Sequence, residues 1–155
     1  MNIIIENRQS DVLICEDSLR LLLQELMHLE KISTDEISVR LVDEKEAADL
    51  HKKYFNDPSC TDCMTFPIDS PSSAQALHCL GEIVICPQIA AMQHLLHHTT
   101  LEEELSLYVI HSFLHLIGFT DKSPKERDEM RIREAICLDH LKTKASLLTV
   151  TKACC

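Results

Sequence analysis

The first 90 residues carry short apolar runs that predict β-strands. Asn2 to Arg8 contains three consecutive β-branched residues, a composition typical of strands. Glu36 to Val42 alternates between polar and apolar side chains as far as Leu41, which predicts a strand with one buried face. Two further apolar runs, Thr61 to Ile68 and Glu82 to Cys86, complete the set of predicted strands.

Helical spacing and capping signals predict about five helices. Leucines three and four residues apart predict a core helix from Glu16 to Glu30. A capping signature begins Asp43 to Tyr54, and a first-turn proline begins a helix from Pro87 to about His98. Thr100 to Gly118 starts with another capping signature and ends at a glycine, the residue expected just past a helix. Ser123 to about Lys142 is the last predicted helix.

This order of elements indicates the fold class and the number of domains. Strands concentrate in the first part of the chain and helices follow, which predicts an α+β fold: a single mixed sheet of about four strands packed with about five helices. A length of 155 residues suits one domain, residues 1–155, whose last few residues we expect to form a loose tail. An apolar content of 45% excludes global disorder.

The lengths of the apolar runs and the net charge restrict where the protein is located and what it can bind. No apolar run approaches the length of a membrane span, and the N-terminus lacks the features of a signal peptide, so we expect a cytoplasmic protein without a membrane partner. The net charge of −10 argues against broad, nonspecific binding of polyanions, although a local basic patch is compatible with it.

The eight cysteines do not form a recognisable metal or disulfide framework. Without a secretory signal, most are predicted to be buried hydrophobic residues or free thiols. Cys60 and Cys63 form a C-x2-C pair, but a zinc knuckle requires a second pair at matched spacing, which the chain lacks. Cys154 and Cys155 belong to the expected tail.

The candidate chemistry lies at the end of the helix that stops at Gly118. His111 and His115 are four residues apart, so both imidazoles leave the same face of that helix. After the glycine the chain can turn back and bring Asp121 towards them. Two imidazoles and one carboxylate give a three-ligand site with an open position, which is typical of catalytic zinc sites. Asp121 thus completes a predicted site for one divalent metal ion, with zinc as the expected ion.

Three alternatives bear on this hypothesis. Histidines at helical spacing also occur as structural residues, and a second pair with the same spacing, His94 and His98, is predicted to be a partly exposed helix face. The spacing of His111, His115 and Asp121 also matches metzincin-like proteases. Such proteases carry a glutamate base directly after the first histidine. Ser112 occupies that position, and a serine cannot accept a proton from water at neutral pH.

Three segments resemble the YbeY family of metal-dependent endoribonucleases, which act in the maturation of ribosomal RNA. The family signature H-G-x-L-H-L-x-G-Y-D-H is similar to His111 to Asp121. The motif T-[DN]-V-L-[ST]-F-P is similar to Thr61 to Pro67, and G-[DE]-I-x-I is similar to Gly81 to Ile85. The three segments agree in order and spacing, so the resemblance covers nearly the whole chain.

The chain departs from the family at three positions. Asp121 stands in place of the third histidine ligand, and Ser112 replaces a glycine. Phe55 follows Tyr54 where family members usually carry an arginine suited to clamping a phosphate. Surface cations and one motif residue are the candidate substrate-binding groups that remain, although each cation is also compatible with a solvated surface charge. These candidates are Lys52, Lys53, Thr61, Lys122 and Arg127.

The resemblance implies a function and its partners. It implies single-strand-specific cleavage of RNA at the 3′ end of small-subunit ribosomal RNA, a role in ribosome quality control, and association with the small ribosomal subunit and its proteins. A bound zinc ion would lower the pKa of water and act as a Lewis acid on a phosphoryl oxygen. The sequence does not single out a general base. Two alternatives stay open: a noncatalytic ribosome-assembly factor stabilised by its metal, and a metalloprotease disfavoured by Ser112.

Overall fold

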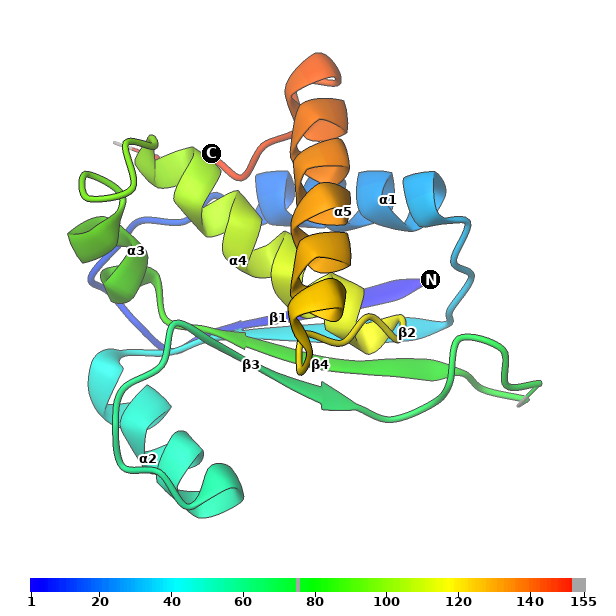
Figure 1. The fold of residues 1–155 in the computed structure, drawn as a ribbon, viewed down its shortest axis with the longest axis horizontal. Helices are drawn as coiled ribbons and strands as arrows, with labels where there is room; N and C mark the ends of the chain where they lie inside the picture. The colour runs from blue at the N-terminus through cyan, green and yellow to red at the C-terminus, as the bar shows by residue number, and fades with distance from the viewer. Residues whose placement is uncertain (75, 152–155) are drawn as a thin grey trace.

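The computed structural model describes residues 1–74 and 76–151 and contains one mixed four-stranded sheet (Figure 1). The strand order is β1-β2-β4-β3, so β1 and β3 form the edges. The β1–β2 and β2–β4 pairs are parallel, whereas β3 and β4 are antiparallel. The strands are β1 (Asn2–Asn7), β2 (Glu36–Leu41), β3 (Cys63–Pro67) and β4 (Cys79–Ile85).

Five helices, counted within the described residues, pack around this sheet and confirm the predicted α+β fold. In Figure 1, α1, α4 and α5 lie on one side of the sheet and α2 lies on the other. None of these helices is both long enough and apolar enough to cross a membrane. The helices are α1 (Glu16–Glu30), α2 (Glu44–Phe55), α3 (Pro87–Gln93), α4 (Leu101–Leu116) and α5 (Pro124–Thr143).

Helix α4 lies in the centre of the core, between the sheet and α5. Ten of its sixteen residues are buried, as expected for a helix that is packed between other elements. Phe113, Ile110 and Leu105 are among the largest fully buried side chains. This packing fixes the position of the last two turns of α4, which carry the two candidate histidine ligands.

A glycine in β4 allows the end of α4 to approach the sheet closely. Gly81 has φ +148°, and a Cβ atom at this position would lie 2.5 Å from the carbonyl oxygen of Phe66 and 2.7 Å from Cδ2 of Leu116. Only a residue without a Cβ fits against both neighbours. The glycine of the third motif therefore serves to seat the last turn of α4 on the sheet.

Two predicted boundaries were wrong. The third helix ends at Gln93 rather than near His98, and His98 itself has φ +56°. Polar side chains compete with the helix here: Nδ1 of His97 lies 2.7 Å from Oε1 of the buried Glu104, and the hydroxyl of Thr99 donates to the other oxygen at 2.9 Å. His94 and His98 therefore do not share a helix face.

The fourth strand is longer than predicted. It begins at Cys79 rather than Glu82, because its first residues pair with the end of β3 and with the start of β2. The expected loose tail at Cys154 and Cys155 lies outside the described residues.

Candidate metal centre and its cleft

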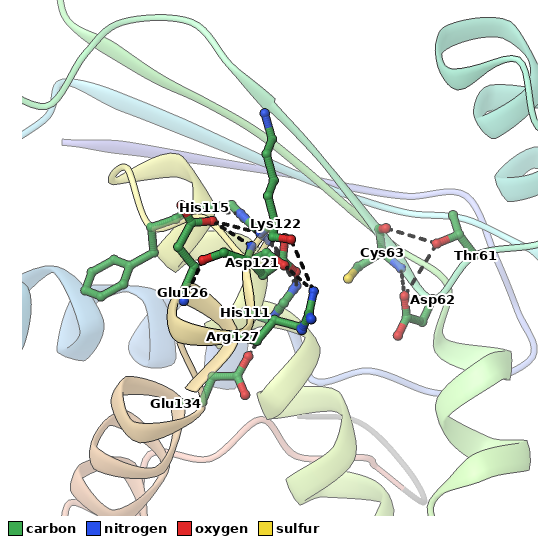
Figure 2. A network of polar contacts seen from close by, with 12 residues as sticks. Thr61, Asp62, Cys63, His111, His115, Asp121, Lys122, Glu126, Arg127 and Glu134 are labelled. Atoms are coloured by element: carbon green, nitrogen blue, oxygen red, sulfur yellow. Dashed lines mark hydrogen bonds and ion pairs between the residues drawn. The ribbon is translucent and has the colours of Figure 1, made fainter. Parts of the chain in front are cut away.

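The three predicted metal ligands converge at the end of α4 (Figure 2). The Nε2 atoms of His111 and His115 lie 3.0 Å apart. Oδ2 of Asp121 lies 3.8 Å from the first and 3.6 Å from the second. Four ligands arranged tetrahedrally at zinc bond lengths are about 3.3 Å apart. The ligand atoms are therefore already spaced for a small divalent ion, and all three residues are half-buried.

Hydrogen bonds to the Nδ1 atoms set the orientation of both rings. Nδ1 of His115 lies 2.9 Å from the carbonyl oxygen of Phe119, which can only accept, so this nitrogen carries the proton. Nδ1 of His111 lies 2.5 Å from Oε1 of Glu134 on α5. In the neutral rings both Nε2 atoms then present lone pairs to the same point, next to a carboxylate. Such a donor set fits a bound cation, and partners of this kind typically support metal-ligating histidines.

The carboxylate of Glu134 also affects the charge of its partner. The hydrogen bond from His111 to Glu134 raises the pKa of His111 above its ordinary value, against the opposing effect of burial. The Glu134 carboxylate thus favours positive charge on the imidazole of His111.

The loop after α4 brings the third ligand into place. Gly118 has φ +109° and follows the last turn of the helix, so the chain can reverse towards α5. At the start of α5, Oε2 of Glu126 accepts from the backbone N–H groups of Lys122 at 2.8 Å and of Ser123 at 3.2 Å. This capping box fixes the loop by its backbone, and the side chain of Asp121 is free to face the two imidazoles.

The predicted substrate-binding residues divide into two groups. The guanidinium of Arg127 donates to the carbonyl oxygens of Asp121 and Lys122 at 3.4 and 3.2 Å, so it stabilises the ligand loop. The hydroxyl of Thr61 donates a hydrogen bond to the carbonyl oxygen of Cys63 at 3.2 Å. By contrast, the ammonium of Lys122 points away from the three ligand atoms (Figure 2).

The two other cations lie on a different element. Lys52 and Lys53 are exposed in the last turn of α2, where Lys53 Nζ lies 5.0 Å above the ring of Tyr54. Neither residue contributes a ligand atom to the metal centre, so any role in binding would concern an extended substrate.

A cleft of about 390 Å³ opens in front of the two imidazoles. Its walls come from three elements: the end of α4 with the following loop, the edge strand β3, and the last turns of α2. Among the described residues, those that line it carry no carboxylate. The lining residues are His51, Phe55, Cys63, Met64, Thr65, Pro67, His111, His115, Gly118, Phe119 and Thr120.

A second cavity of about 420 Å³ lies behind His111. His111 and Cys63 line both spaces, so these two side chains form the wall between them. The second cavity differs in charge because three carboxylates line it: Asp62, Glu104 and Glu134.

The C-x2-C pair does not add a thiolate to the site. Burial raises the pKa of Cys63 and, to a lesser extent, the pKa of Cys60. A thiolate is the form that binds metals and reacts as a nucleophile. Both side chains are free thiols, and their raised pKa values keep them protonated at neutral pH.

Sequence reasoning missed the residues that orient the ligands. Glu134 is 23 positions from His111 in the chain, so no local spacing connects the two. The Phe119 carbonyl is a backbone group, so its role cannot be recognised from the type of residue at that position. The only available signal was the capping box, since Ser123 and Glu126 predicted that α5 would begin just after the ligand loop.

Removal of the Glu134 carboxylate should weaken metal binding without removing a ligand. We expect Glu134→Ala to lower zinc affinity by about 10- to 100-fold, the usual effect of losing a partner that orients a metal-bound histidine. Glu134→Gln keeps an acceptor for Nδ1 and should lose less. Competition with a chromophoric chelator measures both affinities. Equal affinity of wild type and Glu134→Ala would contradict this role.

Comparisons with known proteins identify the family of the chain. A family model described as "Endoribonuclease YbeY" matches residues 4–142. A Chlamydia felis protein named Endoribonuclease YbeY is 39% identical over 153 residues, covering 96% of both chains. One of the same name from Chlamydia pneumoniae is 42% identical over 135 residues, covering 84% of both.

A solved structure agrees with the fold. The solution structure of TM1509 from Thermotoga maritima has a TM-score of 0.65 and 25% identity, and the match covers 92% of this chain and 91% of that one. Together, the matched family model, relatives near 40% identity over most of the chain and the shared fold show that this chain belongs to the YbeY endoribonuclease family.

Proposed function

We propose that this protein is a metal-dependent endoribonuclease that cleaves single-stranded RNA. One observation carries the proposal: two imidazole nitrogens and one carboxylate oxygen lie 3.0–3.8 Å apart at the inner end of an open cleft. Apart from the Asp121 carboxylate of the ligand group itself, no carboxylate lines this cleft within the described part of the chain, so a phosphodiester would meet little further negative charge on its way to the three ligands. The relatives are named endoribonucleases, which supplies the substrate class.

The residues of the site would hold a metal ion and keep its ligands oriented. His111, His115 and Asp121 would hold one divalent ion, for which zinc fits the nitrogen and oxygen donors. When bound, the ion would supply a Lewis acid and lower the pKa of water. Glu134 and the Phe119 carbonyl keep both Nε2 atoms aimed at the site.

Positive charge near the cleft would offset the charge of the backbone and of the transition state. Lys52 and Lys53 are exposed on the helical turn that also carries His51 and Phe55, two residues of the cleft wall. Such cations attract phosphates at a distance and stabilise negative charge that develops during cleavage. They form a local basic patch in a chain whose net charge is −10.

The size of the cleft favours single strands. A cleft of about 390 Å³ admits an extended strand whose bases are unpaired. A double helix presents its scissile phosphates only on a wide, rigid cylinder, and sequence-specific proteins accordingly bind RNA mostly at loops, bulges and ends. The substrate we propose is the 3′ end of small-subunit ribosomal RNA, cleaved in the cytoplasm in contact with the small ribosomal subunit and its proteins, as part of maturation and quality control.

One competing function has specific support. Phe55 occupies the position where the family usually carries arginine, and Asp121 replaces a histidine ligand. Both changes suit a noncatalytic assembly factor whose metal ties α4 to α5 through His111 and Glu134. A protease is less compatible with the site, because Ser112 is fully buried and cannot serve as a base.

A panel of substrates separates these functions. We expect zinc-loaded protein to cut a single-stranded RNA oligonucleotide, and to leave an RNA duplex, single-stranded DNA of the same sequence and casein intact. Dialysis against a chelator should abolish cleavage, and added zinc should restore it. Failure to cut any RNA, alone or within a purified small subunit, would support the assembly factor, and cleavage of casein would support the protease.

A further inference from the structure

Four rings form a cluster where the end of α2 meets the edge strand β3. The ring of Phe55 lies 5.4 Å from that of His51 and 6.1 Å from that of Phe66. Tyr54 contacts Phe66 edge to face, with 5.0 Å between ring centroids. Such distances and tilted geometries are typical of stable aromatic contacts. Phe66 is half-buried against the core, so it anchors the cluster to the sheet.

Packing alone does not account for the whole cluster. Tyr54 and Phe55 remain 55% and 53% exposed, respectively. Exposed aromatic rings that gather in one place usually mark a binding surface, because burying them elsewhere would be favourable. The two residues are neighbours in the chain, yet they face different spaces. Phe55 lines the cleft that contains the metal ligands, whereas Tyr54 lines a separate cavity with Arg40 and Glu82.

The position of Phe55 determines what can contact it. His51 and Phe55 share the wall of one cleft with His111 and His115. A strand that places one phosphate at the two Nε2 atoms must continue past this wall. Lys52 and Lys53 are exposed on the same turn of α2, so they add positive charge near this wall.

We propose that Phe55, supported by His51 and Phe66, is a stacking platform for an unpaired base next to the phosphate that is cut. The inference rests on the proposed function and names a second element of recognition: the face of a base. Every nucleobase has a π-face, so this contact selects unpaired nucleotides without selecting a sequence.

Fluorescence offers a direct test, because the chain contains no tryptophan. Phe55→Trp keeps a stacking ring and introduces a single fluorophore, and Tyr54→Trp is the matched control with nearly equal exposure on a different cavity. The probe is a short single-stranded oligoribonucleotide with 2′-O-methyl groups, which resist cleavage. A second oligonucleotide has the same backbone and abasic sites instead of bases.

Base stacking predicts a distinctive set of results. The oligonucleotide with bases should quench Phe55→Trp strongly, the abasic one should quench it little, and Tyr54→Trp should respond weakly to both. In anisotropy measurements with labelled oligonucleotides, Phe55→Ala should weaken binding of the first by about 10-fold or more and leave the second within about 2-fold. Phe55→Trp should bind both as the wild type does.

The outcomes that overturn the platform differ from those that overturn the nuclease. Equal quenching by both oligonucleotides, equal quenching of both tryptophans, or an unchanged affinity of Phe55→Ala would exclude base stacking at Phe55, whether or not the protein cuts RNA. Base-dependent quenching in a protein that never cuts RNA would retain the platform and reject only the catalytic function. Urea titration of Phe55→Ala and Tyr54→Ala shows whether either loss of affinity reflects unfolding.

Discussion

Replacement of both His111 and His115 by alanine should abolish RNA cleavage and stoichiometric metal binding. The loss of activity should be on the order of 1000-fold or more, because losing a residue that only orients a metal ligand already costs about 10- to 100-fold. Only Asp121 would remain of the three ligands, and one carboxylate on an open surface does not retain zinc. Elemental analysis of the purified variant and cleavage of labelled single-stranded RNA measure the two effects.

The chain supplies a matched control for this experiment. His94 and His98 have the same spacing and residue type but lie in a turn outside the cleft. The double variant His94→Ala and His98→Ala should therefore bind one zinc ion and cut RNA as the wild type does. Urea unfolding separates loss of the site from loss of the fold. Full RNA cleavage by a folded, metal-free variant lacking His111 and His115 would exclude a metal at this site from the reaction.

Substitution of Asp121 should reveal how far the unusual third ligand matters. We expect Asp121→Ala to lower zinc affinity by about 100-fold or more, since it removes the only charged ligand of the three. Asp121→His restores the family's ligand type and should keep tight binding. The loop itself should stay in place in both variants, because Glu126 and Arg127 hold it by backbone groups.

Chelator competition across a range of metals would give the affinities and the metal preference of each variant. The neighbouring Asp128→Ala is the control, since Asp128 is exposed on α5 and contributes no ligand atom. If Asp121→Ala binds zinc as tightly as the wild type, then two histidines alone, or a different third ligand, must account for the site. In that case the separation of 3.6–3.8 Å between Oδ2 of Asp121 and the two nitrogens would have no functional meaning.

Local features of the sequence predicted the ligands and most of the elements. His111, His115 and Asp121 lie within eleven residues, so helix geometry and one glycine turn were enough to bring them together. The strands and four of the five helices also follow from local periodicity. Helix α3 ends early because Glu104, a residue of the next helix, captures His97 and Thr99, which no local pattern could reveal.

The surroundings of the ligands depend on contacts between distant segments. Glu134 reaches His111 only because α5 packs along α4, and His51 and Phe55 reach the cleft only because α2 ends beside β3. These contacts follow from tertiary packing, which overrides short-range preferences and leaves no fixed spacing in the chain. The convergence of the three candidate ligands was therefore predictable from sequence, whereas the residues that orient them and shape the cleft were not.

The side chain of His111 separates two spaces that differ in charge. Behind the imidazole stand Asp62, Glu104 and Glu134, whereas no carboxylate lines the cleft in front of it among the described residues. In the proposed nuclease, hydrolysis of a phosphodiester by water would leave a terminal phosphate with a charge of about −1.5 to −2 at neutral pH, more negative than the single charge before cleavage. The carboxylates at the rear would repel that product more strongly than the intact strand. This charge difference would favour release of the cut end through the mouth by which the strand entered.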